Sequence, residues 1–174
     1  MGNSRLEKIV HSANGHAQRA QPVALVDTQT FLKMLRQQIG ITLIYYPGAW
    51  VDDTLETAFD RKEVIYLDSD NEKNLLKFSP GRNYVMGDYT QPPFKDEIFD
   101  AILYKDNDAT EKEALQILRT LKQGGIVILM DDNACGLNLR PKEFQLLSSF
   151  KKVKLPFRHE EPNYITVFQK GVIL

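Results

Sequence analysis

The feature that most constrains the fold of this chain is the alternation of short, uninterrupted apolar runs with segments of helical periodicity. The runs lack the polar–apolar alternation of a half-exposed strand, as expected for strands buried on both faces. The segments between them carry apolar residues at helical spacing, for example Phe31, Leu32, Leu35 and Ile39. This order predicts a parallel sheet with right-handed crossovers. The expected strands are ITLIYY (41–46), EVIYLDSD (63–70), NYVMGD (83–88), FDAILY (99–104) and IVILM (126–130).

Two helices are expected with signals at their ends, over DTQTFLKMLRQQIG (27–40) and TEKEALQILRTLKQGG (110–125). Asp27 or Thr28 can cap the start of the first helix, and Gly40 can cap its end. Thr110 and Glu113 form a capping box for the other, which we expect to end at Gly124. Shorter helices are expected over DDTLETAF (52–59), NEKNLLKF (71–78) and PKEFQLLSSF (141–150). The alternating segments KKVKLPF (151–157) and NYITVFQK (163–170) predict an edge hairpin.

Composition limits the classes of protein to consider. The net charge is -1 with both signs mixed along the chain, so there is no strong nucleic-acid signature. The single cysteine, Cys135, excludes an internal disulfide and favours a reducing compartment. No apolar run reaches the ~18 residues of a membrane span, and no signal-peptide core is present, so we expect a cytoplasmic protein without a membrane partner. We expect an N-terminal extension over 1–26, partly helical, and one domain over 27–174.

The order of these elements resembles that of the class I S-adenosylmethionine (SAM)-dependent methyltransferases. The segments that carry the resemblance are YYPGAW (45–50), YLDSD (66–70), VMGDYTQPPFKDEIFDAILY (85–104) and ALQILRTLKQGGIVILM (114–130). The resemblance implies an α/β three-layer sandwich, with a mostly parallel seven-stranded sheet and an antiparallel C-terminal strand. It also implies that SAM lies across the carboxyl ends of the first strands, where the strand order reverses.

The resemblance assigns the main chain of the first loop to the methionine part of the cofactor. This loop contains Tyr46, Gly48 and Ala49. The loop is degenerate compared with that of the family. Its strand ends in two tyrosines without the usual acid, and Trp50 stands where a second glycine is expected. The aspartates that follow the loop are more simply interpreted as helix caps.

Three acids complete the candidate cofactor site by resemblance. Asp68 follows Gly48 by 20 positions and would accept the ribose hydroxyls. Asp88 would accept from the adenine amine, and Asp106 follows the fourth strand. Aspartates at strand ends also commonly cap or turn the chain, and this alternative stays open for Asp68 and Asp88.

Catalytic machinery is harder to identify. Asp106, Asp132 and Asn133 offer the oxygen ligands that suit magnesium or calcium, although such residues also favour loops at strand ends. A pairing of Cys135 with His159 is a further alternative.

Three functions therefore remain open. The first is SAM binding with methyl transfer to a small-molecule or partner-presented acceptor. The second is a non-catalytic binding or assembly module that has lost the cofactor. The third is a nucleotide or NAD binder, which lacks the expected glycine-rich phosphate motif. The apolar C-terminal segment GVIL (171–174) would suit a homodimer interface or an edge.

Overall fold

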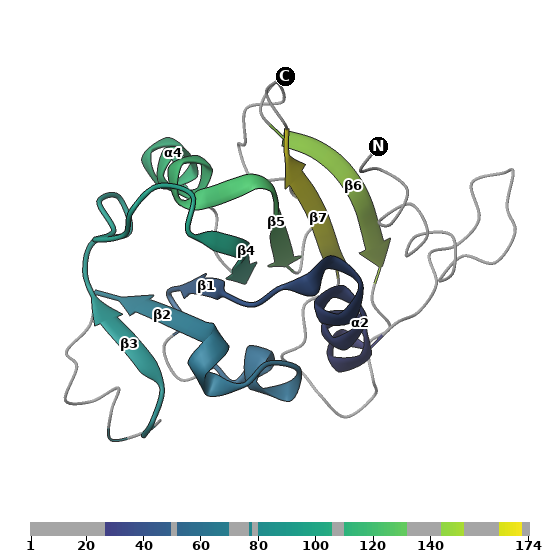
Figure 1. Ribbon diagram of the computed structural model, residues 1–174, viewed down its shortest axis with the longest axis horizontal. Coiled ribbons are helices and arrows are strands. Elements are labelled where there is room, and N and C mark those ends of the chain that lie inside the picture. Colours follow the sequence, from purple (N-terminus) through teal and green to yellow (C-terminus); the bar gives the residue numbers. More distant parts are fainter. Residues whose placement is uncertain are drawn as a thin grey trace, which may run out of the picture.

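The computed structural model describes residues 27–49, 52–69, 77, 80–105, 110–131, 144–151 and 164–171. These residues contain a sheet of seven strands in the order β3-β2-β1-β4-β5-β7-β6 (Figure 1). The strands are β1 (Ile44–Pro47), β2 (Val64–Asp68), β3 (Asn83–Met86), β4 (Phe99–Lys105), β5 (Leu121–Asp131), β6 (Phe144–Lys151) and β7 (Tyr164–Lys170). β7 runs antiparallel to both of its neighbours, and the other pairs are parallel. The predicted sheet is therefore confirmed, whereas residues 1–26 lie outside the described part and their boundary stays a prediction.

The chain starts its sheet in the middle. β1 pairs with β2 on one side, with Ile44 opposite Val64, and with β4 on the other, with Ile44 opposite Ala101. From β1 the strands are added first towards β3 and then towards β5, so the direction of winding reverses between β1 and β4. Open α/β sheets bind their ligands at the carboxyl ends of the strands at such a switch point.

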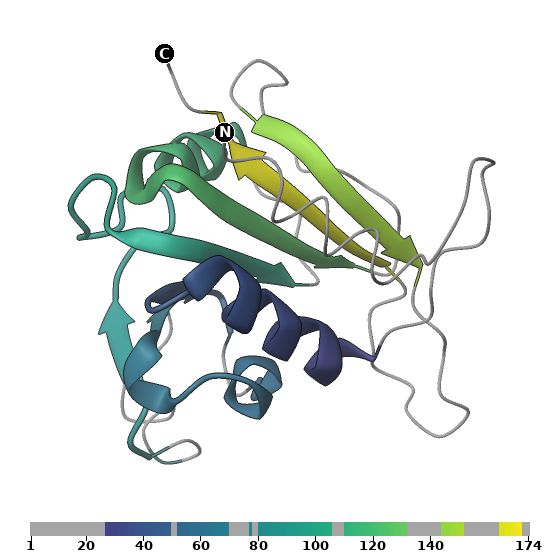
Figure 2. The same ribbon diagram turned by 45° about the vertical axis from the view of Figure 1, so that its right-hand side comes forward.

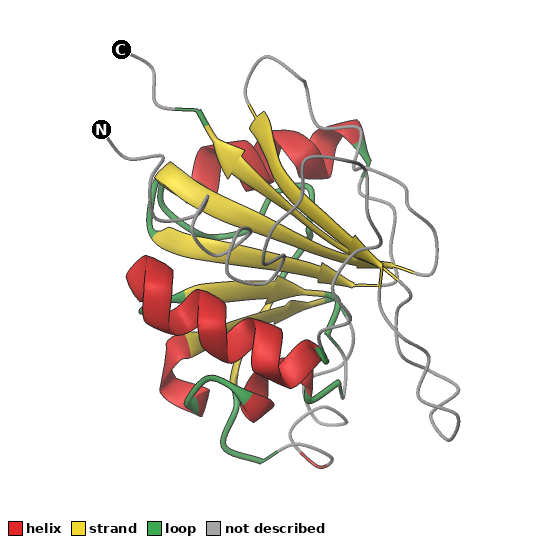
Figure 3. Ribbon diagram, turned by 90° about the vertical axis from the view of Figure 1, so that its right-hand side faces the viewer, coloured by secondary structure: helices red, strands yellow, loops and turns green. Residues whose placement is uncertain are grey.

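Helices cover both faces of the sheet, as Figures 2 and 3 show. One face carries α2 (Thr28–Leu35), which continues into a π-helical turn, η1 (Arg36–Gly40). The same face carries two 3-10 turns, η2 (Thr54–Thr57) and η3 (Arg61–Glu63). The opposite face carries α4 (Glu111–Thr120). The arrangement is a three-layer sandwich, as predicted.

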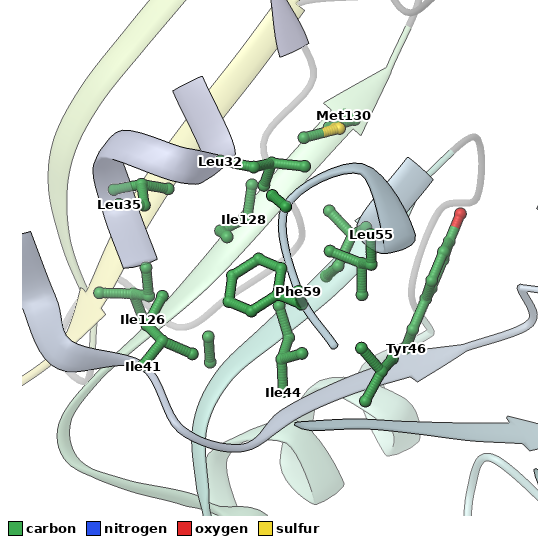
Figure 4. Close-up of a cluster of buried hydrophobic side chains, with 14 of the residues drawn as sticks. Leu32, Leu35, Ile41, Ile44, Tyr46, Leu55, Phe59, Ile126, Ile128 and Met130 are labelled. Carbon is green, nitrogen blue, oxygen red and sulfur yellow. The ribbon is translucent and has the colours of Figure 1, made fainter. Parts of the chain in front are cut away.

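Side chains of successive strand residues enter the two hydrophobic layers in turn. In β1, Ile44 and Tyr46 pack with α2 and η2, whereas Tyr45 packs with α4. Figure 4 shows the α2 layer, where Leu32 and Leu55 lie against the sheet. Both leucines are fully buried. Truncation of such a residue to alanine typically costs about 2–5 kcal/mol of unfolding free energy.

The end signals of the two long helices are largely confirmed. Asp27 Oδ1 accepts from the Thr30 N–H at 2.9 Å. Thr110 and Glu113 cap each other, with the Thr110 N–H donating to Glu113 Oε2 at 2.6 Å. The predicted end of α4 at Gly124 is wrong, because β5 already begins at Leu121. Gly124, at φ 73°, lies where the β4–β5 register shifts and the strand bulges.

Two predicted helices are wrong. The segment 52–59 forms only the single turn η2, because the Asp52 side chain caps Thr54 and the chain turns again soon afterwards at η3. Residues 144–150 of the expected helix 141–150 form most of β6, and β6 is the strand that pairs with β7. Apart from Lys151, the predicted strand 151–157 lies outside the described residues. β6 pairs with β7 along its length, and this pairing outweighs the local helical pattern. Apart from Lys77, the helix predicted over 71–78 lies outside the described residues.

Candidate functional site

The candidate site is the edge of the sheet where β1, β2, β3 and β4 end, which we call the carboxyl rim. We define it by residues at these strand ends or within five positions after them: Gly48, Ala49, Asp52, Asp68, Ser69, Gly87, Asp88, Tyr89 and Lys105. It includes the switch point between β1 and β4. Four of the predicted cofactor residues, Gly48, Ala49, Asp68 and Asp88, therefore lie on one edge.

The first loop turns sharply and joins the neighbouring strand. Gly48 has φ 64°, a conformation that side chains other than glycine rarely adopt, and its N–H donates to the Leu67 carbonyl at 2.9 Å. Ala49 is buried, and its carbonyl accepts from the Asp52 N–H at 2.7 Å. The side chain of Tyr46 lies in the α2 layer beside Leu55, with its hydroxyl pointing away from the aliphatic side chains (Figure 4).

Asp68 is held by a tyrosine from the loop after β3. Its side chain is nearly buried, with 5% of the residue exposed. The Tyr89 hydroxyl donates to Asp68 Oδ1 at 3.2 Å, and the Ser69 N–H donates to the same hydroxyl at 3.3 Å. Burial, with the nearby Asp68 carboxylate adding to it, raises the pKa of Tyr89, so the phenol is neutral at physiological pH. A buried carboxylate at the end of β2 thus has a neutral partner that can rotate.

Asp88 is exposed and forms a local turn. Its Oδ1 accepts from the Thr90 N–H at 2.7 Å, and its carbonyl accepts from the Gln91 N–H at 3.0 Å. The hydrogen bond from Thr90 lowers the pKa of Asp88. Its neighbour Tyr89 contacts Asp68, so the loop brings the two acids to the same part of the rim.

An ion pair at the switch point joins the end of β4 to the segment that follows β1. Lys105, the last residue of β4, places Nζ against the carboxylate of Asp52 and donates to Thr54 Oγ1 at 3.2 Å. The side chains of Lys105 and Asp52 are only 12% and 25% exposed. Burial raises the pKa of Asp52, but the hydrogen bonds from Lys105 and Thr54 outweigh it and the pKa is lowered. Asp52 is therefore ionised and paired.

The sequence interpretation missed this pair, since it treated Asp52 only as a helix cap. The alternation of side chains along β4 could have indicated it. Side chains two apart in a strand point to the same face, so Lys105 shares the face of Ala101 and Leu103. Both of those residues lie in the α2 layer, where the segment after β1 also packs.

The remaining candidate residues lie outside the part of the chain that the structure describes. They are Trp50, Asp106, Asp132, Asn133, Cys135 and His159. Within the part of the chain that the structure describes, no three His, Cys, Asp or Glu residues form a group that could hold a metal ion. The helices of that part are also too short or too polar to cross a bilayer.

The chemistry of the rim differs between the end of β2 and the switch point. The Asp68 carboxylate has the chemistry to accept hydroxyl groups, and Tyr89, its phenol partner, is a neutral group whose displacement leaves no unpaired buried cation. At the switch point the protein already holds an ammonium beside a carboxylate. The pair is net neutral, and the carboxylate is its more exposed member.

Comparison with known proteins identifies the fold. The chain matches no protein-family model and no curated protein sequence. Among solved structures, the [4+2]-cyclase SpnF superposes with a TM-score of 0.59 at 13% identity, covering 96% of this chain and 93% of its own. A SAM-dependent methyltransferase from Methanosarcina mazei gives a TM-score of 0.54 at 15% identity, covering 75% and 92%.

A third match comes from Haloferax volcanii, in a complex of the Trm112 methyltransferase activator with a protein described as a methyltransferase. Its TM-score is 0.57 at 14% identity, and it covers 99% of this chain and 94% of its own. At this identity the matches establish the fold alone. Together with the strand order, they show that the protein has the class I methyltransferase-like fold.

Proposed function

Because the protein has the class I methyltransferase-like fold, we propose that it binds SAM at the carboxyl rim and transfers the methyl group to a small-molecule or partner-presented acceptor. The observation that carries this proposal is the place of Asp68. It ends β2, next to the first strand of the sheet, and it is a buried carboxylate held by a neutral phenol. A carboxylate has the acceptor capacity for both hydroxyls of a ribose.

Other residues of the rim would contact the methionine and adenine parts of SAM. The main chain of Tyr46, Gly48 and Ala49 would face the methionine part, and the left-handed turn at Gly48 is compatible with close approach of a ligand to the backbone. Asp88 would accept from the adenine amine through its exposed carboxylate, and Asp106 would complete the site.

Bound SAM would supply an electrophilic methyl group. The chain's own contribution to the reaction would be positioning, which can account for a large part of the acceleration of such a displacement.

A second candidate function is a non-catalytic binding or assembly module that has lost the cofactor. Two observations favour it. The Asp52–Lys105 pair already occupies the switch point, and the segment after β1 is a single 3-10 turn where a full helix was expected. The match to a [4+2]-cyclase is consistent with a fold that serves more than one chemistry.

Calorimetric titration of the full chain with SAM and with its demethylated product, S-adenosylhomocysteine, tests the first proposal. We expect micromolar binding of at least one of them. Asp68→Asn should weaken it by about 10- to 150-fold, because a hydrogen bond to a charged group contributes about 1.5–3 kcal/mol. Asp60→Asn, at an exposed position in the segment before β2, is a matched control and should leave the affinity unchanged.

Two outcomes contradict the proposal. The absence of heat with both ligands at millimolar concentration excludes a SAM site. Unchanged affinity in Asp68→Asn, with circular dichroism showing an intact fold, removes Asp68 from the site. The absence of binding of both ligands to a folded chain would support the second function.

A further inference from the structure

The segment between β3 and β4, residues 87–98, contains no helix, and we call it the crossover loop. It passes over the α4 side of the sheet, where Tyr89, Phe94 and Ile98 pack against the hydrophobic layer. Its adjacent prolines, Pro92 and Pro93, lack the N–H groups that a helix needs. Buried carbonyl groups in such a loop require donors from another element of the structure.

Arg119, in the last turn of α4, supplies these donors to the crossover loop. Its Nη1 donates to the Phe94 carbonyl at 2.7 Å and to Asp96 Oδ1 at 2.7 Å, and its Nη2 donates to the Pro92 carbonyl at 3.2 Å. Its Nε donates to Gln116 Oε1 at 2.8 Å, which orients the side chain on the helix. Because the guanidinium is a planar fork with five N–H donors, it binds several acceptors at once.

Only two tight turns separate these contacts from the carboxyl rim. The Phe94 N–H donates to the Pro92 carbonyl at 2.8 Å, and the Gln91 N–H donates to the Asp88 carbonyl at 3.0 Å. The hydrogen bonds of Asp88 within its own turn fix the shape of that turn. The place of the turn over the sheet depends on the longer-range contacts of the loop, including those of Arg119.

Close packing limits how far parts of the crossover loop can move separately. A Cβ atom added at Gly87 would lie 3.3 Å from Pro93 Cδ, so the loop folds back closely over its own start. The Phe94 ring packs against Tyr45 and Phe99, with ring centroids 5.2 and 5.0 Å apart. A shift of the loop at residues 92–94 is therefore transmitted to its first residues.

We propose that Arg119 is a positioning residue for base recognition, which acts through the crossover loop and places the Asp88 carboxylate where the exocyclic amine of a purine nucleoside can donate to it. α4 ends where β5 begins, so Arg119 lies away from the carboxyl rim and acts on the ligand only through the loop. This inference rests on the proposed adenosine site and specifies how the rim selects the base.

The role of Arg119 should be greatest when the site is occupied. In the free protein the Tyr89 hydroxyl also ties the loop to the sheet, through its contact with Asp68. In the proposed complex the ribose displaces this hydroxyl. The loop then depends on Arg119 and on the packing of Phe94 to keep Asp88 in place.

The test compares adenosine with purine riboside, which lacks only the 6-amino group. In calorimetric titrations of the full chain, we expect the wild type to bind adenosine about tenfold more tightly, because the amine adds a hydrogen bond to a charged but exposed acceptor. Arg119→Met should reduce this preference to about twofold. Both nucleosides carry the same ribose, and an unfolded fraction lowers both apparent affinities equally, so effects on Asp68 and on stability cancel in the ratio.

Arg36 provides a matched control on the opposite face of the sheet. It directly follows α2 and donates to the Ala58 carbonyl and to Glu63 Oε1, both at 2.8 Å. Its side chain is 34% exposed and that of Arg119 is 32% exposed. Arg36→Met should therefore cost similar stability and leave the adenosine preference unchanged.

Arg119→Lys provides a second variant at the same position. It retains the positive charge in the last turn of α4 and replaces the fork by a single ammonium, so the preference should be intermediate. This variant keeps the proposal testable if Arg119→Met fails to fold.

A second measurement needs no ligand. The Ser69 N–H donates to the Tyr89 hydroxyl at 3.3 Å, so its NMR amide resonance reports the place of the crossover loop. In the free chain, Arg119→Met should move this resonance in the same direction as Tyr89→Phe, which removes the hydroxyl. Arg36→Met should leave the resonance in place.

The failure of this proposal is distinguishable from that of the adenosine site. If adenosine binds, three results overturn the role of Arg119 alone: equal wild-type affinity for the two nucleosides, a preference that stays near tenfold in Arg119→Met, or a Ser69 resonance that does not move. An equal loss of preference in Arg36→Met also overturns it, because general destabilisation is then the cause. If neither nucleoside binds the wild type at millimolar concentration, both proposals fall together.

Discussion

The two edges of the parallel sheet use aspartates in opposite ways. At the amino rim, which we define as Thr42, Leu43, Glu97, Asp100, Lys122 and Lys170, Asp100 binds mainly to the backbone. Its Oδ2 accepts from the N–H groups of Thr42 at 3.0 Å and Leu43 at 2.9 Å and from the Thr42 hydroxyl at 2.7 Å. Its Oδ1 accepts from Lys122 Nζ at 2.6 Å.

A buried lysine strengthens the same edge. Lys170, near the end of β7, donates its Nζ to the Leu121 carbonyl at 2.7 Å and to Glu97 Oε1 at 3.2 Å. Both partners belong to segments that start β4 or β5. The amino rim therefore joins four strands through contacts that include the backbone.

At the carboxyl rim, the backbone donors to Asp52 and Asp88 are local, and the contacts to distant segments come from side chains. Asp68 accepts from the Tyr89 phenol, and Asp52 accepts from the Lys105 ammonium. Side-chain donors can rotate without unfolding the chain, whereas the backbone donors of the amino rim cannot. The comparison supports a role for the amino rim in the stability of the sheet, and it is consistent with the proposal that ligands bind at the carboxyl rim.

The largest effect should come from the amino rim. Asp100→Ala leaves two backbone N–H groups and Lys122 without their acceptor, so we expect it to lower the free energy of unfolding by about 3 kcal/mol. Chemical denaturation measures this change. A loss below about 1 kcal/mol would show that water replaces the carboxylate and that the amino rim is not a special source of stability.

Acid should weaken the same edge. Burial raises the pKa of Asp100, but the hydrogen bonds from Lys122, Thr42 and Leu43 lower it further, and the net pKa lies below its usual value of 3.8. A lowered pKa in the folded state adds stability that is complete above pH 3.8 and is lost as the pH falls through the folded-state pKa. Asp100→Asn should therefore flatten the acid limb of unfolding free energy against pH. An unchanged acid limb would contradict this assignment.

Double-mutant cycles should separate the two lysine pairs. The Asp52–Lys105 pair is the more buried, since the Lys105 side chain is 12% exposed and that of Lys122 is 45% exposed. We expect a coupling free energy of about 1–2 kcal/mol for Asp52 with Lys105 and about 0.5 kcal/mol for Asp100 with Lys122. The reverse order would mean that the amino rim depends on its lysine and not on its backbone donors.

The smallest effect should follow from the removal of one phenol. Tyr89→Phe removes the hydroxyl group that donates to Asp68, so we expect the unfolding free energy to change by less than about 1 kcal/mol. Because a ligand no longer has to displace that donor, its affinity should rise by up to about fivefold. Weaker binding would show that Tyr89 contacts the ligand directly. Tyr84→Phe, whose hydroxyl accepts from Arg82, is the control.

The sequence predicted the sheet well, because buried parallel strands and helix caps have local signatures. The apolar runs located β1 to β5, and the capping box at Thr110 located the start of α4. It failed at 144–150, where the long-range pairing of β6 with β7 decides the conformation. It also failed at 52–59, where a local hydrogen bond from the Thr54 N–H to Asp52 accompanies a single 3-10 turn.

The site was predicted less completely than the fold. Because the carboxyl ends of parallel strands lie at one edge of a sheet, the sequence predicted that Asp68 and Asp88 lie there together. It did not predict the hydrogen bond of Tyr89 to Asp68 or the ion pair of Lys105 with Asp52. Both contacts join segments that lie far apart in sequence. Their geometry depends on the sheet order, which no local pattern encodes.

The most direct test of the central claim is to map backbone amide shifts by NMR while S-adenosylhomocysteine is added to the labelled full chain. If the carboxyl rim is the ligand edge, the amides of Gly48, Ser69 and Gly87 should shift with a common saturable dependence on ligand concentration. The amides of Leu43 and Asp100 at the amino rim should stay in place. Shifts confined to the amino rim, or no shifts at millimolar ligand, would contradict the account.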